Sequence, residues 1–248
     1  MSIWGKVIGG VAGFAVGGPL GAILGAVAGH AVDRAKIKSP DDGAGFDADT
    51  RQVAFTTAVI VLCAKMAKAD GQVTPDEIAA FKRMFQIPPD EMKKVGELFN
   101  EAKKESTGFE PYAEQVGRLF AHEPAVLEEL IAALFIIAKA DGVVDPSELT
   151  FVAQVAARFG LDAHQFERLK TIHLGNSGGE ANPYEILSLT KDADEKTIKS
   201  TYRKLIRENH PDTLMAQGVP QEFIDLATDK MATINAAYDQ ISKLRGIK

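Results

Sequence analysis

The stretch Arg207-Glu-Asn-His-Pro-Asp-Thr213 decides how the C-terminal part of this chain folds. Proline restricts the residue before it to extended conformations, so His210-Pro211 should end the helix predicted upstream. Asp212 then supplies an acceptor that can fix an exposed turn or face a partner. A tripeptide can recur by chance, so its flanking residues must decide whether the turn is functional.

Helices are predicted on both sides of the turn. Asp194 is placed to cap an upstream helix that runs to about Glu208, and residues 221 to 245 have the apolar spacing of a second long helix. The two should form an antiparallel hairpin with the tripeptide at its tip. One side of the upstream helix carries a basic stripe, which consists of Lys196, Lys199, Arg203 and Arg207, with Lys204 nearby. Such a stripe is usually a solvated face, but one that leads to an exposed turn can steer an acidic partner surface.

Four motifs resemble the J domain in order and spacing across residues 183 to about 245. They are Tyr184-Glu-Ile-Leu187, Ile198-Lys-Ser-Thr-Tyr202-Arg-Lys-Leu205, His210-Pro-Asp212 and Ile234-Asn-Ala-Ala-Tyr238. The resemblance implies docking on a DnaK-type chaperone ATPase and stimulation of its ATP hydrolysis. It assigns partner contact to His210, Pro211, Asp212, Lys199, Tyr202, Arg203 and Lys204. It assigns core packing to Leu187, Ile198, Leu205, Ala237 and Tyr238. The chain departs from the family pattern at Thr213, where lysine is common, and in residues 215–222, which lengthen the loop.

An internal repeat organises the middle of the chain. Ala67-Lys-Ala-Asp70-Gly71-Gln-Val73-Thr-Pro75-Asp-Glu77-Ile78 aligns, 71 positions later, with Ala138-Lys-Ala-Asp141-Gly142-Val-Val144-Asp-Pro146-Ser-Glu148-Leu149. Each copy lies between apolar helical runs, which predicts two related helix-turn-helix units. The doubled pattern resembles the TerB family over roughly Val53 to Leu174, which implies a helical fold with an acidic surface for a metal ion or a partner.

The acidic residues of the repeat have two interpretations. Asp70, Glu77, Asp141 and Glu148 could hold a divalent ion, since the spacing overlaps that of a calcium loop. The first two ligand positions of such a loop are apolar or basic here, however. Thr74-Pro75-Asp76-Glu77 and Asp145-Pro146-Ser147-Glu148 also fit capping boxes with proline at the first helical position, and this interpretation explains the spacing better.

The N-terminal segment has no charged residue from Val7 to Gly29, a length of 23 residues that matches a bilayer core of about 30 Å. Glycine recurs there at every fourth position. Glycine costs about 1 kcal/mol in a soluble helix, whereas close-packed membrane helices favour small residues four apart. We therefore expect a membrane anchor that can self-associate through Gly9, Gly13, Gly17, Gly21, Gly25 and Gly29. A peripheral hairpin and a cleaved leader are the alternatives.

Charge and composition set the remaining expectations. Basic residues follow the apolar segment, so the rest of the chain should lie in the cytoplasm, with the anchor crossing the inner membrane once. The lone cysteine, Cys63, suits a reducing compartment. The net charge is −6 and no folded part is globally basic, which argues against nucleic acid as a partner. No cofactor and no enzymatic activity are expected, because the histidines lack metal-ligand spacing and no nucleophile motif is present.

The predicted organisation is therefore all-α. It comprises a glycine-rich anchor (1–38), a linker (39–50), a TerB-like helical domain (51–174), a second linker (175–182) and a J domain (183–248). This order resembles the DjlA-type, DnaJ-like membrane co-chaperones of bacteria. The expected function is recruitment of a DnaK-type ATPase to the membrane. The alternative is an ion-responsive or scaffolding stress protein in which the J domain is accessory.

Overall fold

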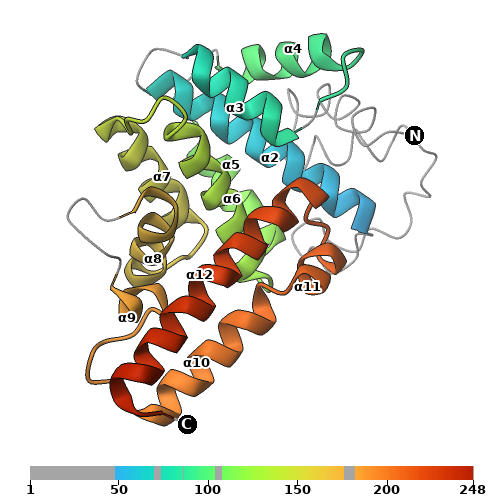
Figure 1. Ribbon diagram of the computed structural model, residues 1–248. Helices are drawn as coiled ribbons and strands as arrows, with labels where there is room; N and C mark the ends of the chain where they lie inside the picture. Colours follow the sequence, from blue (N-terminus) through green and yellow to red (C-terminus); the bar gives the residue numbers. More distant parts are fainter. Residues whose placement is uncertain (1–47, 70–73, 86, 104–107, 176–181, 248) are drawn as a thin grey trace.

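The computed structural model describes residues 48–69, 74–85, 87–103, 108–175 and 182–247, and every regular element in those ranges is a helix (Figure 1). The all-α prediction is confirmed for this described part. In chain order the helices are α2 (Ala48–Ala69), α3 (Pro75–Phe85), α4 (Met92–Lys103), α5 (Glu110–Leu119), α6 (Pro124–Ala138), α7 (Pro146–Arg158), α8 (Ala163–Leu174), α9 (Pro183–Ile186), α10 (Glu195–Glu208), α11 (Pro211–Ala216) and α12 (Gln221–Arg245).

Two helices, α2 and α6, form the centre of the TerB-like domain. Residues 53–67 of α2 are all buried, and so is almost all of α6. A helix that is apolar on every side must be surrounded by other elements. Accordingly α2 contacts α4, α6 and α7, while α6 also contacts α3, α7 and α8. The two central helices end at the two copies of the sequence repeat, and α3 and α7 begin within those copies.

The repeat turns are closed by capping boxes, as predicted. Glu77 accepts a hydrogen bond from the Thr74 backbone N–H at 2.6 Å, and the Glu77 N–H donates to Thr74 Oγ1 at 3.1 Å. In the second copy Glu148 accepts from the Asp145 N–H at 3.0 Å, and Asp145 in turn caps α7. Gly142 has a φ of +88°, which allows the chain to reverse before this cap. These contacts explain the repeated spacing without a metal ion.

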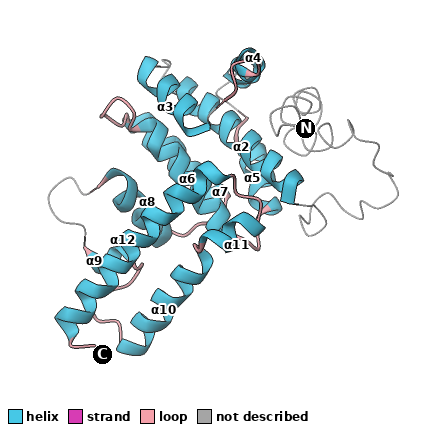
Figure 2. Ribbon diagram, turned by 45° about the vertical axis from the view of Figure 1, so that its right-hand side comes forward, coloured by secondary structure: helices cyan, strands magenta, loops and turns pink. Residues whose placement is uncertain are grey.

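The C-terminal module is the predicted hairpin. Helices α10 and α12 run antiparallel and lie side by side in both ribbon views (Figures 1 and 2). Asp194 caps α10, as expected, and Asn182 caps α9. The core of this hairpin is a small apolar cluster with the core residues assigned by the resemblance among its members. Its buried residues are Tyr184, Ile186, Leu187, Ile198, Leu205, Ile234, Ala237 and Ile241, with Tyr238 partly buried against them.

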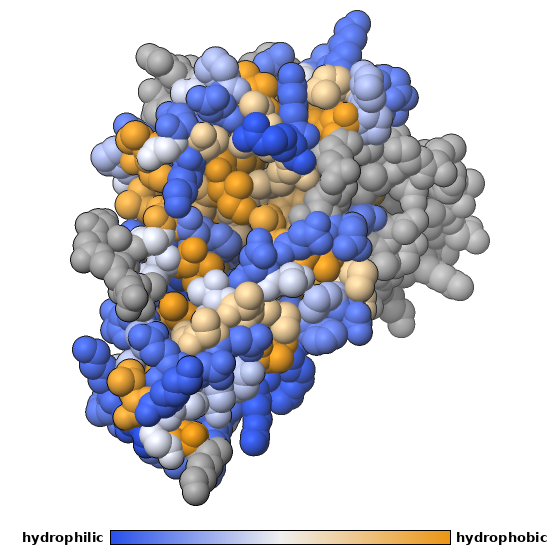
Figure 3. Space-filling view, viewed as in Figure 1, coloured by the Kyte–Doolittle hydropathy of each residue, from blue (hydrophilic) through white to orange (hydrophobic). Residues whose placement is uncertain are grey.

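The J domain and the TerB-like domain share apolar packing. Leu214 of α11 and Phe223 of α12 are both fully buried, and they belong to the larger core that α2 and α6 organise. The Phe223 ring meets the rings of Phe55 and Phe85, with centroids 4.7 Å and 5.5 Å away. On the face shown in Figure 3, the largest hydrophobic area lies in a hollow in the TerB-like part, and the hairpin surface is mostly polar. The first part of α12 therefore fixes the hairpin to the larger domain.

A buried ion cluster reinforces this contact. Lys230 of α12 is 1% exposed, and its ammonium lies 2.5 Å from a carboxylate oxygen of Glu129 and 3.3 Å from one of Glu128. Arg168 of α8 pairs with the other oxygen of Glu128. Burial raises the pKa of the Glu129 carboxyl even though Lys230 opposes the shift. Such a cluster contributes little net stability but is costly to break, so it specifies how the two domains meet.

Candidate docking site for a partner ATPase

The His-Pro-Asp tripeptide forms the start of a short helix. His210 is the N-cap of α11, with its backbone extended (φ −65°, ψ 134°) as the following proline requires. Its Nδ1 accepts a hydrogen bond from the Asp212 backbone N–H at 3.2 Å. The Asp212 side chain is 83% exposed. The His210 side chain thus caps α11 while the Asp212 carboxylate faces solvent.

The segment after the tripeptide differs from the sequence-based expectation. An extended loop was predicted over residues 215–222, but helix α11 runs to Ala216 and only four residues separate it from α12. Leu214 is buried, and so are Val219 and Pro220 just beyond α11. The extra length folds because these apolar side chains have the TerB-like core to pack against, a partner that periodicity within the J domain cannot reveal.

Two polar residues that flank the tripeptide bond to backbone carbonyls of α10, a role that sequence reasoning assigned to neither of them. Thr213 Oγ1 donates to the Arg207 carbonyl oxygen at 3.2 Å, and the Asn209 amide donates to the Leu205 carbonyl oxygen at 2.8 Å. Asn209 is only 1% exposed. Thr213 satisfies a carbonyl that no further turn of α10 can reach, whereas the Asn209 side chain adds a second donor to the Leu205 carbonyl, which also accepts the Asn209 backbone N–H. The place of Asn209, directly before the tripeptide and at the end of a helix, is the signal that could have identified it.

The structure gathers part of the predicted contact set into one surface depression. Its lining residues come from the end of α10 and the start of α11, and they are Tyr202, Arg203, Ile206, Arg207, His210 and Thr213. Arg203 also lines an adjoining depression with Lys196 and Lys199. The basic stripe therefore continues along α10 into the tripeptide. Lys204 and Asp212 are exposed but line neither depression.

Tyr202 has a structural role in addition to any contact with a partner. Its ring stacks on that of Tyr238, with centroids 4.0 Å apart and planes 11° from parallel. Its hydroxyl donates to Asn235 Oδ1 at 2.9 Å. The stack and the hydrogen bond join α10 to α12, and the Tyr202 side chain is half-buried between them. The cross-helix stack places Tyr202 on the side of α10 that faces α12.

The candidate metal residues are not brought together in the described part of the chain. Glu77 and Glu148 act as caps, Asp141 accepts from the Val143 N–H at 2.9 Å, and Asp70 lies outside the described residues. No group of three potential ligands from His, Cys, Asp and Glu is found among the residues described. The ion-binding interpretation stays a prediction.

The predicted membrane anchor, with its six spaced glycines and its charge-free run, lies within residues 1–47, outside the described part of the structure. Within the described ranges, no helix is both long and apolar enough to span a bilayer.

Cys63 is buried in α2, and burial raises the pKa of its thiol well above the ordinary value. Burial therefore disfavours the thiolate, which is the nucleophilic form.

The helical hairpin, the capped tripeptide and the adjoining basic stripe together define a J-domain co-chaperone. Family comparisons agree, since residues 182–245 match the DnaJ domain and residues 56–171 match the tellurite resistance protein TerB. Residues 1–42 match the co-chaperone DjlA transmembrane domain. The chain is 32% identical over 286 residues to the co-chaperone protein DjlA of Aliivibrio fischeri, with both chains fully covered.

Two further relatives are equally complete matches. They are the co-chaperone proteins DjlA of Vibrio parahaemolyticus, 31% identical over 284 residues, and of Shewanella oneidensis, 32% identical over 270 residues, each with both chains fully covered. The chain therefore belongs to the DjlA co-chaperone family. Membership implies membrane association, and the J domain implies a DnaK-type partner. No solved structure matches the chain.

Proposed function

We propose that this protein docks a cytoplasmic DnaK-type chaperone through its J domain and stimulates the ATP hydrolysis of that chaperone. The observation that carries the proposal is the continuous surface formed by the basic residues of α10 and by His210. A rigid turn beside a row of cations offers an acidic partner both a steering field and a fixed contact point. Arg203 lies between the two depressions and should contribute to both.

The protein performs no catalysis of its own in this proposal. The Nδ1 atom of His210 already accepts the Asp212 N–H, and the side chains of His210 and Asp212 are exposed, with His210 at an open surface depression. A general base needs a positioned substrate proton within hydrogen-bond reach. His210 is better suited to shape the turn, while Asp212 and the basic stripe contact the partner.

Single-turnover ATP hydrolysis by a DnaK-type ATPase tests the proposal. The full-length protein should accelerate hydrolysis, and His210→Gln or Asp212→Asn should abolish the acceleration without loss of helical circular dichroism. Arg203→Ala should weaken it and reduce its salt dependence, because the charge acts mainly on association. Lys170→Ala, on the surface of α8, is the matched control. Equal stimulation by the His210 and Asp212 variants would sink the proposal.

We also propose that the N-terminal segment crosses the inner membrane once, places the described domains in the cytoplasm and forms a homodimer through its spaced glycines. The buried thiol of Cys63 makes a clean background for maleimide labelling. Leu244, which is 70% exposed, is a suitable position for a new cysteine. In Leu244→Cys, an impermeant maleimide should react only after the inner membrane is opened. Labelling in intact spheroplasts would contradict this orientation.

The dimer has its own test. Gly17→Leu and Gly21→Leu together should abolish crosslinking of the protein in membranes, because larger side chains prevent close helix approach. Substitution of intervening residues by leucine should have a smaller effect. Equal crosslinking in both variants would contradict self-association through the glycines.

A further inference from the structure

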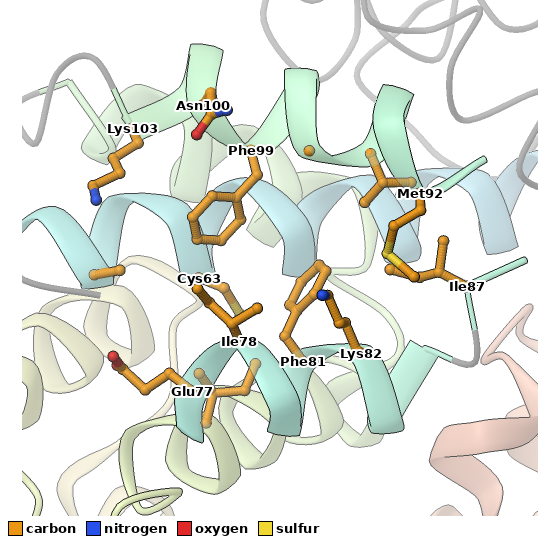
Figure 4. A pocket seen from close by; sticks show the side chains of 14 residues that line it. Cys63, Glu77, Ile78, Phe81, Lys82, Ile87, Met92, Phe99, Asn100 and Lys103 are labelled. Atoms are coloured by element: carbon orange, nitrogen blue, oxygen red, sulfur yellow. The ribbon is translucent and has the colours of Figure 1, made fainter. Parts of the chain in front are cut away.

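A groove lies between α3 and α4 (Figure 4), and it shares no lining residue with the docking surface of the J domain. Its volume is about 330 Å³, within the range of about 300–1,000 Å³ that is common for ligand sites. Phe81 and Phe99 pack edge to face in its lining, with ring centroids 5.7 Å apart, and Cys63 of α2 is also among the residues that line it. Ile78 is 42% exposed at its edge, which is unusual for a large apolar side chain.

The groove is long. Its lining on α4 runs from Met92 to Lys103, which corresponds to roughly 16 Å of helix. An extended chain advances about 3.3 Å per residue, so about five residues of a polypeptide would occupy that length. Figure 4 shows Ile87 and Met92 at one end of the groove and Glu77 and Lys103 at the other.

The polar residues of the groove point to its occupant. Glu77 is 4% exposed, and while one of its carboxylate oxygens caps α3, the other has no hydrogen-bond partner. A buried acceptor without a donor is costly, so an occupant that brings an N–H group gains from meeting it. Lys103 and Lys82 are present as donors at the edge of the same groove. An occupant must therefore supply both donors and acceptors along an apolar length.

We propose that this groove binds an unfolded segment of a client polypeptide, whose apolar side chains pack against the contacting rings of Phe81 and Phe99 and whose amide groups meet Glu77 and Lys103. A peptide amide carries one donor and one acceptor, which matches this pair of charges. A fatty acid offers only an anionic acceptor, and it would leave the buried Glu77 oxygen without a donor. The charges thus favour a polypeptide over a lipid chain.

The groove and the docking surface lie in one body, because Phe223 and Lys230 fix the hairpin to the TerB-like core. A client segment held in the groove would then be presented at a constant position relative to the bound ATPase. Peptide binding itself does not depend on ATPase stimulation, so the two proposals can fail separately.

Fluorescence anisotropy with full-length protein in lipid nanodiscs tests the proposal. The probe is a fluorescein-labelled peptide with a Leu-Phe-Asn-Leu core between glycine and serine flanks, and a Gly-Ser-Asn-Ser core is its control. The parent should bind the first peptide and not the second. Gly96 lies in α4 and lines the groove, and a Cβ built on it meets nothing within 4 Å. Gly96→Leu should therefore fold normally, fill the groove and weaken binding about tenfold or more.

Glu77→Gln is the second variant. Glutamine can still accept the Thr74 N–H, as capping boxes allow, but it presents its amide donors where the peptide donor should lie. Binding should weaken about tenfold, in line with the loss of a hydrogen bond to a charged group. Glu148→Gln, the same change in the other repeat, is the matched control and should bind like the parent. Thermal unfolding followed by circular dichroism checks that each variant is folded.

Two results would overturn the proposal. One is unchanged peptide affinity in both Gly96→Leu and Glu77→Gln. The other is binding of palmitate, but not of the peptide, that Gly96→Leu removes, since that would make the groove a lipid site.

Discussion

The edge of the Phe223 ring packs against the Phe55 ring at an interplanar angle of 72°, and this contact joins the J domain to the first helix of the TerB-like repeat. Edge-to-face aromatic pairs contribute about 0.5–1.5 kcal/mol beyond the area they bury. Phe223 is fully buried although its helix also forms one arm of the surface hairpin. The docking surface is thereby held at a fixed position on a larger domain.

Phe223→Ala should lower the free energy of unfolding by about 3–5 kcal/mol, because it leaves a cavity between two other phenylalanine rings. Urea denaturation measured by circular dichroism gives this value. Leu244→Ala in the same helix is the control, since Leu244 is 70% exposed and should change stability by less than about 0.5 kcal/mol. Equal urea midpoints for Phe223→Ala and Leu244→Ala would show that the J domain and the TerB-like domain do not share a core.

Lys230→Met should cost about 3–5 kcal/mol, because it leaves the buried Glu129 carboxylate without its cation. Adding Glu129→Gln to Lys230→Met should recover most of the loss, since the double variant removes both charges. Glu128 keeps its pair with Arg168 in either case. A double-mutant cycle from denaturant midpoints measures the coupling. Additive losses would show that the two charges do not interact.

His173 should make the protein sensitive to mild acid. Burial of its ring, assisted by the charges of Lys230 and Lys139, lowers its pKa from 6.5 to about 3. The folded state therefore keeps His173 neutral between these values while the unfolded state takes up a proton. The contribution of His173 to the free energy of unfolding is fully present above pH 6.5. Below that pH it falls by about 1.4 kcal/mol per pH unit, until the pH approaches 3.

His173→Phe should flatten this dependence, and the ring of Phe135 beside it can accept a second aromatic ring. The measurement is the difference in unfolding free energy between parent and variant from pH 7 to pH 4. Taking the difference removes the opposite slope that the raised pKa of Glu129 contributes. A difference that does not vary with pH would contradict the burial of a neutral His173.

Gly117→Ala should destabilise the contact of α5 with α7. A Cβ at Gly117 would lie 2.9 Å from the Arg158 carbonyl oxygen and 3.3 Å from the Phe159 Cα, and neither backbone atom can move freely. The expected cost is about 1–3 kcal/mol. Gly96→Ala is the matched control, because it has open space and should stabilise α4 by up to about 1 kcal/mol. Thermal midpoints that rise for both variants would show that α5 and α7 can separate without cost.

Local chemistry made much of this molecule predictable. The caps at Asn182 and Asp194 and the boxes of the repeat depend on residues at most three positions apart, so the sequence contains both partners. Helix α12 was predicted at 221 to 245 and is observed at Gln221–Arg245, because its apolar period is regular and Gly246 ends it in a left-handed conformation.

Contacts between distant segments could not be predicted in the same way. Lys230 and Glu129 are 101 positions apart, and nothing in the pattern around Lys230 distinguishes it from a solvated lysine. The burial of Leu214 in the TerB-like core could not be predicted either, because Leu214 belongs to the short helix α11, whose end was predicted to be a loop. Phe81 and Phe99 each have ordinary helical spacing, and only the placement of α3 against α4 brings their rings into contact and leaves a groove beside them.

By itself, the sequence determined the helical class, the repeat, the hairpin and the tripeptide at its tip, because periodicity and capping act over a few residues. Only the tertiary structure decided that the hairpin is anchored by Phe223 and Lys230, that Glu77 has a carboxylate oxygen without a donor, and that a groove is open beside it. Burial and pairing at those positions depend on which helices pack together, and packing is a property of the whole fold.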